Sequence, residues 1–324
     1  MQSNKAVKKN IQWDKYMVYL IFVGVFLVFA VVLGNKGFLS ANNIINILRQ
    51  TTMISIMAVA GTLVMAAGQI DLTVGAVAAM TAMIVSLILQ STNSIFLALV
   101  AGILFGCLIG ALNGILVTKF GLPAFLATMG MMQVVRGSAM WITDTAAVPI
   151  GNKTFCTIFG IGEIAGIPVL LLWTFVFYVA GFALFNKTSF GRHILATGGN
   201  ETSAQYSGVN TVKIKIIAFI LSGAFAAFAG ILYAGRLQAG RYSYGDGDEM
   251  SVIAAVVLGG TSMSGGTGSV IGALFGSVLM GMINNALILA NLSSAQQTIV
   301  KGMIIILAVA MSNIAQKRLR ITER

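Results

Sequence analysis

Residues 190–210 read FGRHILATGGNETSAQYSGVN, a polar stretch with several Gly and Asn residues that separates two long apolar segments. Neither 164–186 nor 216–235 contains a charged residue. At about 1.5 Å per helical residue, each segment is long enough to cross the roughly 30 Å apolar core of a bilayer. The polar stretch is therefore predicted to be a loop between two membrane spans.

Basic residues predict on which side of the membrane this loop lies. Cytoplasmic loops of membrane proteins are enriched in Lys and Arg. We therefore expect a cytoplasmic loop over residues 187–214, because basic or titratable side chains gather in and beside it: Lys187, Arg192, His193, Lys213 and Lys215.

The two ends of the chain show the same bias. The leader, residues 1–15, carries Lys5, Lys8, Lys9 and Lys15, and the tail, residues 316–324, carries Lys317, Arg318, Arg320 and Arg324. Both termini are therefore expected in the cytoplasm, which requires an even number of spans.

Composition indicates that the whole chain, residues 1–324, is a single transmembrane domain. The sequence is 57% apolar and 9% charged, against about 25% charged in an average soluble domain. The net charge of +11 lies mainly beside the apolar runs. A nucleic-acid surface would need a basic face on a soluble domain. The composition thus indicates an all-α polytopic membrane protein that does not bind nucleic acid.

Charge-free runs predict about ten transmembrane helices. Two of these tracts, 50–118 and 250–300, are too long for one span, and the polar, Gly-rich stretches QIDLTVG (69–75) and TSMSGGTGS (261–269) divide them. The predicted spans are 16–34, 50–68, 73–90, 95–118, 123–142, 166–186, 215–235, 250–264, 268–289 and 297–315.

A weak internal repeat relates the two halves of the chain. GALNGILV (110–117) resembles GMINNALI (281–288), which is an offset of 171 residues. The same offset carries spans two to five onto spans seven to ten, in the opposite direction. Such inverted repeats are common in transporters.

The sequence offers no catalytic centre. It contains no G-x-x-x-x-G-K-[ST] motif to bind nucleotide phosphates, and no nucleophile–base pair is evident. One histidine and two distant cysteines make a metal site unexpected. We therefore expect a protein that is not an enzyme and needs neither a cofactor nor a metal.

Polar residues within the apolar runs are the candidates for a translocation pathway. Asp71 is the one acid of the tract 50–118. It either serves proton or cation coupling, or caps the next helix at an expected cytoplasmic break. Arg136 is expected to pair with Asp71 or with a backbone carbonyl, or to extend outward. The uncharged candidates are Gln69, Asn113, Gln133 and Asn284.

The segment AGRYSYGDGDEM (239–250) is expected on the external side. It is either a solvated loop or a docking surface for a soluble partner, since Tyr and Arg are good interface anchors. The docking candidates are Arg241, Tyr242, Tyr244, Asp248 and Glu249.

Three motifs together resemble the membrane permeases of bacterial sugar-importing ABC transporters, of the ribose type. They are QIDLTVG, FGRHILATGGNETSAQYSGVN and IAAVVLGGTSMSGGTGSVIG (253–272). The resemblance covers residues from about 42 to 310. It implies a bacterial inner-membrane subunit that forms a path for ribose or a related monosaccharide.

The resemblance also implies the partners. They are a second permease copy (identical or a paralogue), a cytoplasmic ATP-binding subunit, and a periplasmic or lipid-anchored sugar-binding protein. The cytoplasmic loop is expected to couple to the ATPase through Arg192, Gly199, Asn200, Glu201, Ala204 and Gly208. Two rival functions are a secondary transporter driven through Asp71 and a membrane receptor or scaffold that moves no solute.

Overall fold

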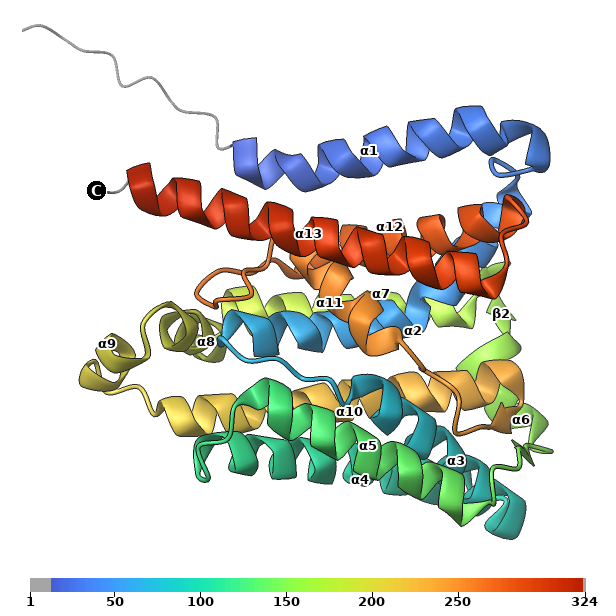
Figure 1. Cartoon of the computed structure of the whole chain (residues 1–324). Helices are drawn as coiled ribbons and strands as arrows, with labels where there is room; N and C mark the ends of the chain where they lie inside the picture. The colour runs from blue at the N-terminus through green and yellow to red at the C-terminus, as the bar shows by residue number, and fades with distance from the viewer. Residues whose placement is uncertain (1–12, 323–324) are drawn as a thin grey trace, which may run out of the picture.

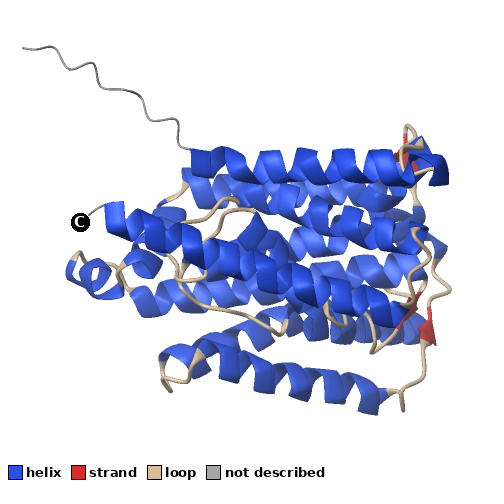
Figure 2. Ribbon diagram, turned by 45° about the horizontal axis from the view of Figure 1, so that its top comes forward, coloured by secondary structure: helices blue, strands red, loops and turns tan. Residues whose placement is uncertain are grey.

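The protein is a bundle of long helices, and the computed structural model describes residues 13–322 (Figures 1 and 2). In these residues the helical segments are α1 (Trp13–Leu33), η1 (Gly34–Lys36), α2 (Ala41–Ala66), α3 (Val74–Thr92), α4 (Ile95–Thr118), α5 (Ala124–Ile142), α6 (Lys153–Cys156), η2 (Thr157–Ile161), α7 (Val169–Lys187), α8 (Ser189–Gly199), α9 (Glu201–Tyr206), α10 (Thr211–Leu237), α11 (Asp248–Leu258), α12 (Val270–Leu289) and α13 (Ser294–Thr322).

Four two-residue strands lie together at one end of the bundle (Figure 2). β1 (Val148–Pro149) pairs antiparallel with β4 (Ala239–Gly240), and β2 (Glu163–Ile164) pairs with β3 (Ile167–Pro168). We call this the strand end. The short helices α8 and α9 lie at the other end, together with the start of α1 and the last turns of α13 (Figure 1). We call that the α8–α9 end.

The helical membrane fold is confirmed, whereas the number of spans is not. Among the described residues, seven helices are long and apolar enough to cross a membrane. They correspond to the predicted spans 16–34, 50–68, 73–90, 95–118, 166–186, 215–235 and 268–289. The predicted spans 123–142, 250–264 and 297–315 match α5, α11 and α13, which do not reach that standard. The leader lies outside the described residues up to position 12, as do residues 323–324 of the tail.

Two predicted boundaries are wrong for identifiable reasons. The span 250–264 is a helix of only 11 residues, which is about 16 Å long and spans half of a bilayer core. It ends at Leu258 because two glycines follow, and Gly260 has a φ of +86° that favours glycine. In contrast, α2 begins nine residues before the predicted span, where the Ser40 side chain accepts a hydrogen bond from the Asn43 N–H.

The helix bounds follow the predicted repeat. Adding 171 to the bounds of α2 gives 212 and 237, and α10 is Thr211–Leu237. The same shift carries α3, α4 and α5 onto the regions of α11, α12 and α13. Figure 1 shows that α2 runs from the strand end to the α8–α9 end and that α10 runs back. The bundle is therefore arranged as two inverted halves.

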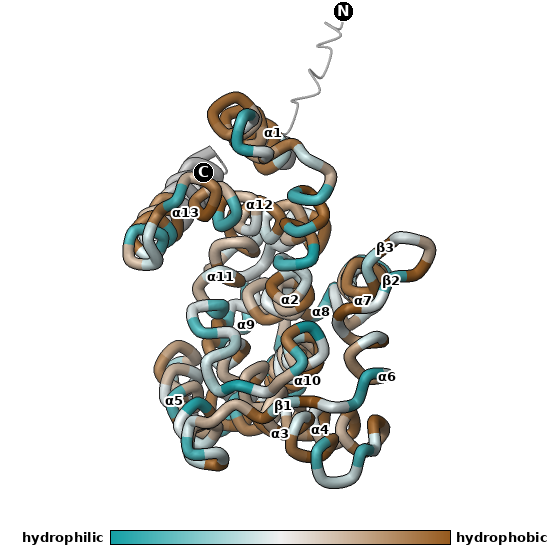
Figure 3. Tube along the Cα trace, turned by 90° about the vertical axis from the view of Figure 1, so that its right-hand side faces the viewer, coloured by the Kyte–Doolittle hydropathy of each residue, from teal (hydrophilic) through white to brown (hydrophobic). Residues whose placement is uncertain are grey.

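Helices α2 and α10 form the centre of the bundle, as the view along the helices shows (Figure 3). α4 packs on α10 through glycines: a methyl group on Gly106 would lie 2.2 Å from the Gly223 carbonyl oxygen, and one on Gly110 would lie 2.2 Å from that of Phe219. In lipid the hydrophobic effect does not bring helices together, so their association depends on close packing. Small residues permit the close approach of backbones that such packing needs.

The repeat-related pair, α12 on α2, uses small polar residues as well. Ser277 and Ser55 hydroxyls lie 2.7 Å apart, and the Asn285 side chain donates to Asn43 Oδ1 at 2.8 Å. Both pairs, α4 on α10 and α12 on α2, therefore pack through small residues within this chain. α1 and α13 lie at the edge of the bundle (Figure 3).

Candidate functional site

Two chain segments return into the bundle between consecutive helices (Figure 1). After α2 ends at the α8–α9 end, residues 67–73 turn back, and α3 begins partway along the bundle. After α10 ends at the strand end, residues 238–247 turn back, and α11 begins partway from the opposite side. Interrupted helices of this kind form solute and ion sites in transporters.

The first turns of α3 and α11 meet inside the bundle. A methyl group on Gly75 would lie 2.1 Å from the Gly245 carbonyl oxygen and 2.8 Å from Glu249 Oε2. Gly245 itself has a φ of +64°, which favours glycine. We call this place, defined by Gly75, Gly245 and Glu249, the crossing. Two helix N-termini, each with free N–H groups, therefore point into the same region.

Asp71 fixes the returning segment in front of α3. It is 8% exposed, and its Oδ1 accepts hydrogen bonds from the Thr73 N–H at 2.9 Å and the Thr73 hydroxyl at 2.6 Å. The side chain of Asn113, on α4, donates to Thr73 Oγ1 at 3.1 Å. Asp71 thus supports the turn that precedes α3, close to the predicted capping role, but it is buried in the bundle.

Polar groups from α4 and α10 lie beside Asp71. The Ser222 hydroxyl, on α10, makes a hydrogen-bonding contact with the Asp71 carboxylate, whereas the buried Asn113 Oδ1 has no hydrogen-bond partner in the described structure. Ser222 was not among the predicted site residues. Buried polar atoms normally find partners, so Asn113 Oδ1 is able to accept a hydrogen bond from a solute hydroxyl.

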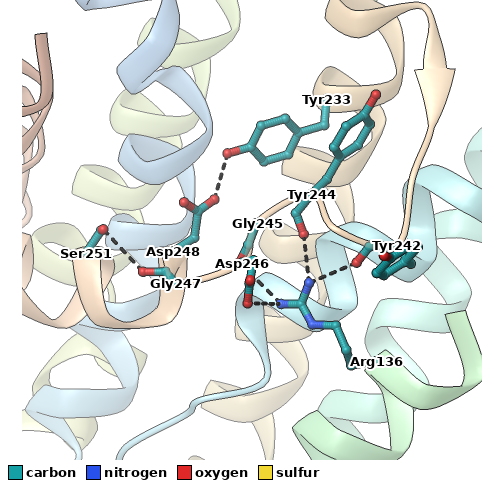
Figure 4. Close-up of polar contacts among 9 residues, drawn as sticks. All are labelled: Arg136, Tyr233, Tyr242, Tyr244, Gly245, Asp246, Gly247, Asp248 and Ser251. Atoms are coloured by element: carbon teal, nitrogen blue, oxygen red, sulfur yellow. Dashed lines mark hydrogen bonds and ion pairs between the residues drawn. The ribbon is translucent and has the colours of Figure 1, made fainter. Parts of the chain in front are cut away.

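Arg136, on α5, holds the second returning segment (Figure 4). Its guanidinium donates to the carbonyl oxygens of Tyr242 at 2.9 Å, Tyr244 at 3.2 Å and Gly245 at 3.4 Å, and it lies 3.7 Å from Asp246 Oδ1. Of the predicted partners, the backbone carbonyl is therefore the correct one. The Arg guanidinium is planar and has five N–H donors, so it can donate hydrogen bonds to several carbonyl oxygens at once.

The segment 239–250 lies only partly at the surface. Arg241 is exposed, but Glu249 is 8% exposed. The Tyr233 hydroxyl, which comes from α10, donates to Asp248 Oδ2 at 2.7 Å (Figure 4). Tyr233 and Tyr244 rings stack with centroids 5.6 Å apart. The structure thus holds Asp248 against α10 and buries Glu249 in the bundle.

The remaining pathway candidates lie apart from these contacts. Gln69 is half-buried at the end of α2, where its N–H donates to the Val64 carbonyl oxygen at 3.0 Å. Gln133 is exposed on α5. Asn284 lies on α12, and its buried Oδ1 has no hydrogen-bond partner in the described structure. The structure therefore brings together Asp71 and Asn113, and separately Arg136 and the α11 segment.

The loop at the α8–α9 end is two short helices with defined caps. Asn200 ends α8 and caps α9, because its Oδ1 accepts the Ser203 N–H at 2.9 Å. Ala204 is the buried residue of α9. Gly208 has a φ of +84° with nothing nearby, so it serves the turn that leads to α10. Arg192, on α8, is exposed.

Two features of this loop region were not predicted from the sequence: the ion pair of Lys215 and the exposure of Tyr206. Lys215, on α10, donates to both carboxylate oxygens of Glu201 at 2.7 Å, and its side chain is 11% exposed. Tyr206, at the end of α9, is 89% exposed. Neither feature has a sequence signal, since the ion pair joins residues 14 apart and the exposure of Tyr206 depends on how α9 sits.

Metal binding has no support in the described residues, where no group of three His, Cys, Asp or Glu side chains is found. Cys107 is half-buried and Cys156 is buried, and both are free thiols. Burial raises the pKa of the Cys156 thiol, so little reactive thiolate forms.

These features define the chain as a multi-pass helical membrane permease with inverted halves. Residues 43–309 match the family described as the branched-chain amino acid transport system / permease component, and the chain belongs to that family. No solved structure matches the chain.

Curated relatives resemble nearly the whole chain. It is 40% identical to the ribose import permease protein RbsC of Escherichia coli K12 over 282 residues, which is 86% of this chain and 88% of the relative. It is also 40% identical to the RbsC protein of Haemophilus influenzae, over 95% and 97% of the two chains. The L-arabinose transport system permease protein AraH of E. coli is 35% identical, over 95% and 93%.

Proposed function

We propose that this chain is the permease subunit of an ATP-driven, binding-protein-dependent sugar importer of the bacterial inner membrane, for ribose or a related monosaccharide. The observation that carries the proposal is 40% identity to ribose import permeases along almost their full length. Relatives for L-arabinose at 35% identity extend the solute class to monosaccharides in general. ATP hydrolysis belongs to a separate subunit.

The proposed topology has about ten membrane crossings, with the α8–α9 end in the cytoplasm. That end gathers basic residues from separate segments, among them Lys119, Lys187 and Lys213. Leader 1–15, loop 187–214 and tail 316–324 then share one side, as the positive-inside bias requires. The membrane spans beyond the seven apolar ones are α5, α11 and α13. Of these, α11 is long enough for only half of the bilayer core.

The loop 187–214 is proposed to couple to the ATPase. The Glu201–Lys215 ion pair joins α9 to α10, so a force on α9 is passed to a central helix. Tyr206 is the most suitable anchor for a groove on the partner, because it is an exposed aromatic side chain at the tip of the loop. Two permease copies, identical or paralogous, would present two such loops.

The crossing and its surroundings are proposed to line the solute path. Arg136 donates to the Gly245 carbonyl oxygen of the crossing, and Asp71 and Asn113 bond Thr73 just before α3. The other candidates lie on neighbouring segments: Gln69, Gln133 and Asn284. Amide and hydroxyl groups can exchange hydrogen bonds with sugar hydroxyls. The sugar-binding protein, periplasmic or lipid-anchored, is proposed to dock at the strand end, where Arg241 is exposed and Tyr242 is half-exposed.

The test is transport by purified parts. The permease, an ATPase and a sugar-binding protein encoded beside it are reconstituted in vesicles, and radiolabelled ribose uptake is measured. We expect uptake that requires both ATP and the binding protein. Uptake that persists without ATP but collapses with the proton or sodium gradient would contradict the proposal.

One observation favours a second candidate function, a proton- or cation-coupled transporter. Asp71 is a buried carboxyl group within the bundle, and ionisable groups within membranes often serve ion coupling. Asp71→Asn separates the two functions: an importer keeps ATP-dependent uptake in the variant, whereas an ion-coupled transporter loses its dependence on the gradient.

A further inference from the structure

Three segments at or next to the family motifs touch one another at the α8–α9 end. Gly68 follows α2 and directly precedes QIDLTVG, Gly198 and Gly199 end α8, and Gly265 and Gly266 lie in TSMSGGTGS between α11 and α12. We call these residues the glycine joint. They come from three segments that are far apart in the sequence.

The contacts in the glycine joint are between backbones. A methyl group on Gly198 would lie 2.0 Å from the Ala66 carbonyl oxygen and 2.7 Å from the Gly266 nitrogen. One on Gly265 would lie 2.7 Å from the Gly198 carbonyl oxygen and 2.8 Å from the Gly68 nitrogen. No side chain fits at positions 198 and 265 unless the segments move apart.

A hydrogen bond and the backbone conformation fix the arrangement further. The Gly266 N–H donates to the Ala66 carbonyl oxygen at 3.0 Å, which ties the α11–α12 loop to the end of α2. Gly68, Gly265 and Gly266 have φ values of +75°, +82° and +80°. Glycine is therefore required there for conformation as well as for space.

The glycine joint stands between the α8–α9 loop and both interrupted helices. Gly68 begins the returning segment that passes through Asp71 to α3. Gly265 and Gly266 follow α11, whose first turn meets Gly75 of α3 at the crossing. Backbones in direct contact are nearly incompressible. A displacement of α8 is therefore passed to α3 and α11 together, rather than absorbed by side-chain rotation.

We infer that the glycine joint positions the two interrupted helices according to the state of the α8–α9 loop, and so transmits ATPase closure to the crossing. This inference rests on the proposed function. It assigns positioning roles to Gly198, Gly265 and Gly266, which hold the three segments together through backbone contacts.

The test is Gly198→Ala in the assembled transporter with its ATPase and binding protein. We measure ATP hydrolysis with and without sugar-loaded binding protein, together with sugar uptake. The stimulation ratio should fall by about fivefold or more, in the range of ordinary coupling between distant sites. The ratio is measured only on complexes in which the ATPase still co-purifies with the variant permease.

Gly110→Ala is the matched control. Its added methyl group meets the Phe219 carbonyl oxygen at 2.2 Å, a clash as severe as that at Gly198, but between α4 and α10. It should lower thermal stability without lowering the stimulation ratio of the assembled complex. A merely structural role for Gly198 predicts the same result for both variants.

If Gly198→Ala fails to fold, Gly266→Ala is used as the test variant in its place. Its methyl group would lie 2.7 Å from the Gly199 Cα, and the φ of +80° at this position adds backbone strain. Because it perturbs the glycine joint from the opposite segment, it should lower the stimulation ratio as well. If the variants assemble and keep the wild-type stimulation ratio, the inference about the glycine joint is wrong, while the proposed function is unaffected. Wild-type complexes that show no stimulated hydrolysis or uptake would instead overturn the proposed function.

Discussion

Lys215 and Glu201 form an ion pair between the start of α10 and the first turn of α9, with the ammonium 2.7 Å from each carboxylate oxygen. The Lys215 side chain is 11% exposed and that of Glu201 is 43% exposed. The motif residue Glu201 therefore holds the α8–α9 loop to a central helix of the bundle, instead of pointing to a partner alone.

Breaking this pair should weaken coupling more than folding. Glu201→Gln removes the charge but keeps the shape, and a half-exposed pair contributes only about 1 kcal/mol to the free energy of unfolding. We expect a small change in melting temperature and a several-fold lower uptake per ATP hydrolysed. The charge swap Glu201→Lys with Lys215→Glu should restore part of the uptake. No recovery in the swap would mean that Glu201 acts by contacting the ATPase directly.

Tyr206 should contribute to binding of the ATPase without contributing to stability. Because it is 89% exposed, Tyr206→Ala removes almost no internal contact. An anchor of this kind is typically worth about 1–2 kcal/mol, which is a loss of affinity of roughly 5- to 30-fold. The measurement is titration of detergent-solubilised permease with purified ATPase. Tyr19, which packs on Phe275 at 4.8 Å, gives a contrasting variant whose alanine form should lose stability and keep affinity.

The crossing should not tolerate a side chain at position 75. In Gly75→Ala the new methyl group meets the Gly245 carbonyl oxygen at 2.1 Å and the Glu249 carboxylate at 2.8 Å. Overpacking of this kind costs about 1–3 kcal/mol. We expect a lower melting temperature and weak uptake.

Gly137→Ala is the control for the crossing, since nothing lies within 4 Å of a methyl group there. It sits within α5 and should leave the melting temperature unchanged or raise it slightly, because Ala favours helix over Gly. Equal melting temperatures for the two variants would show that α3 and α11 are not in contact in the membrane.

The sidedness of the α8–α9 end is tested by cysteine labelling. Ser203→Cys places a thiol on exposed α9, and Gly151→Cys places one at the strand end, where a Cβ has open space. In a Cys107→Ala background the remaining native thiol, Cys156, is buried and its pKa is raised.

A membrane-impermeant maleimide added to spheroplasts should modify position 151 and not position 203. Opening the membrane with detergent should expose position 203 as well. Modification of position 203 in sealed spheroplasts would invert the proposed topology and remove the α8–α9 loop from any cytoplasmic ATPase.

The sequence by itself determined the helical membrane fold, most span positions and the repeat. These depend on short-range properties, because a run of apolar residues must be helical in lipid to satisfy its own backbone. The offset of 171 residues, read from two eight-residue segments, relates α2 to α10 to within a residue.

Only the tertiary structure decided how the polar breaks are used. Hydropathy marks QIDLTVG and AGRYSYGDGDEM as interruptions, but it carries no information on depth, so both were placed at a membrane surface. Their return to the crossing depends on contacts across the bundle, such as Arg136 with the Tyr242 carbonyl oxygen and Gly75 with Gly245. The glycine joint likewise joins residues up to 198 positions apart (Gly68 and Gly266). A glycine in a sequence shows freedom of conformation, and only its neighbours in space show what it must touch.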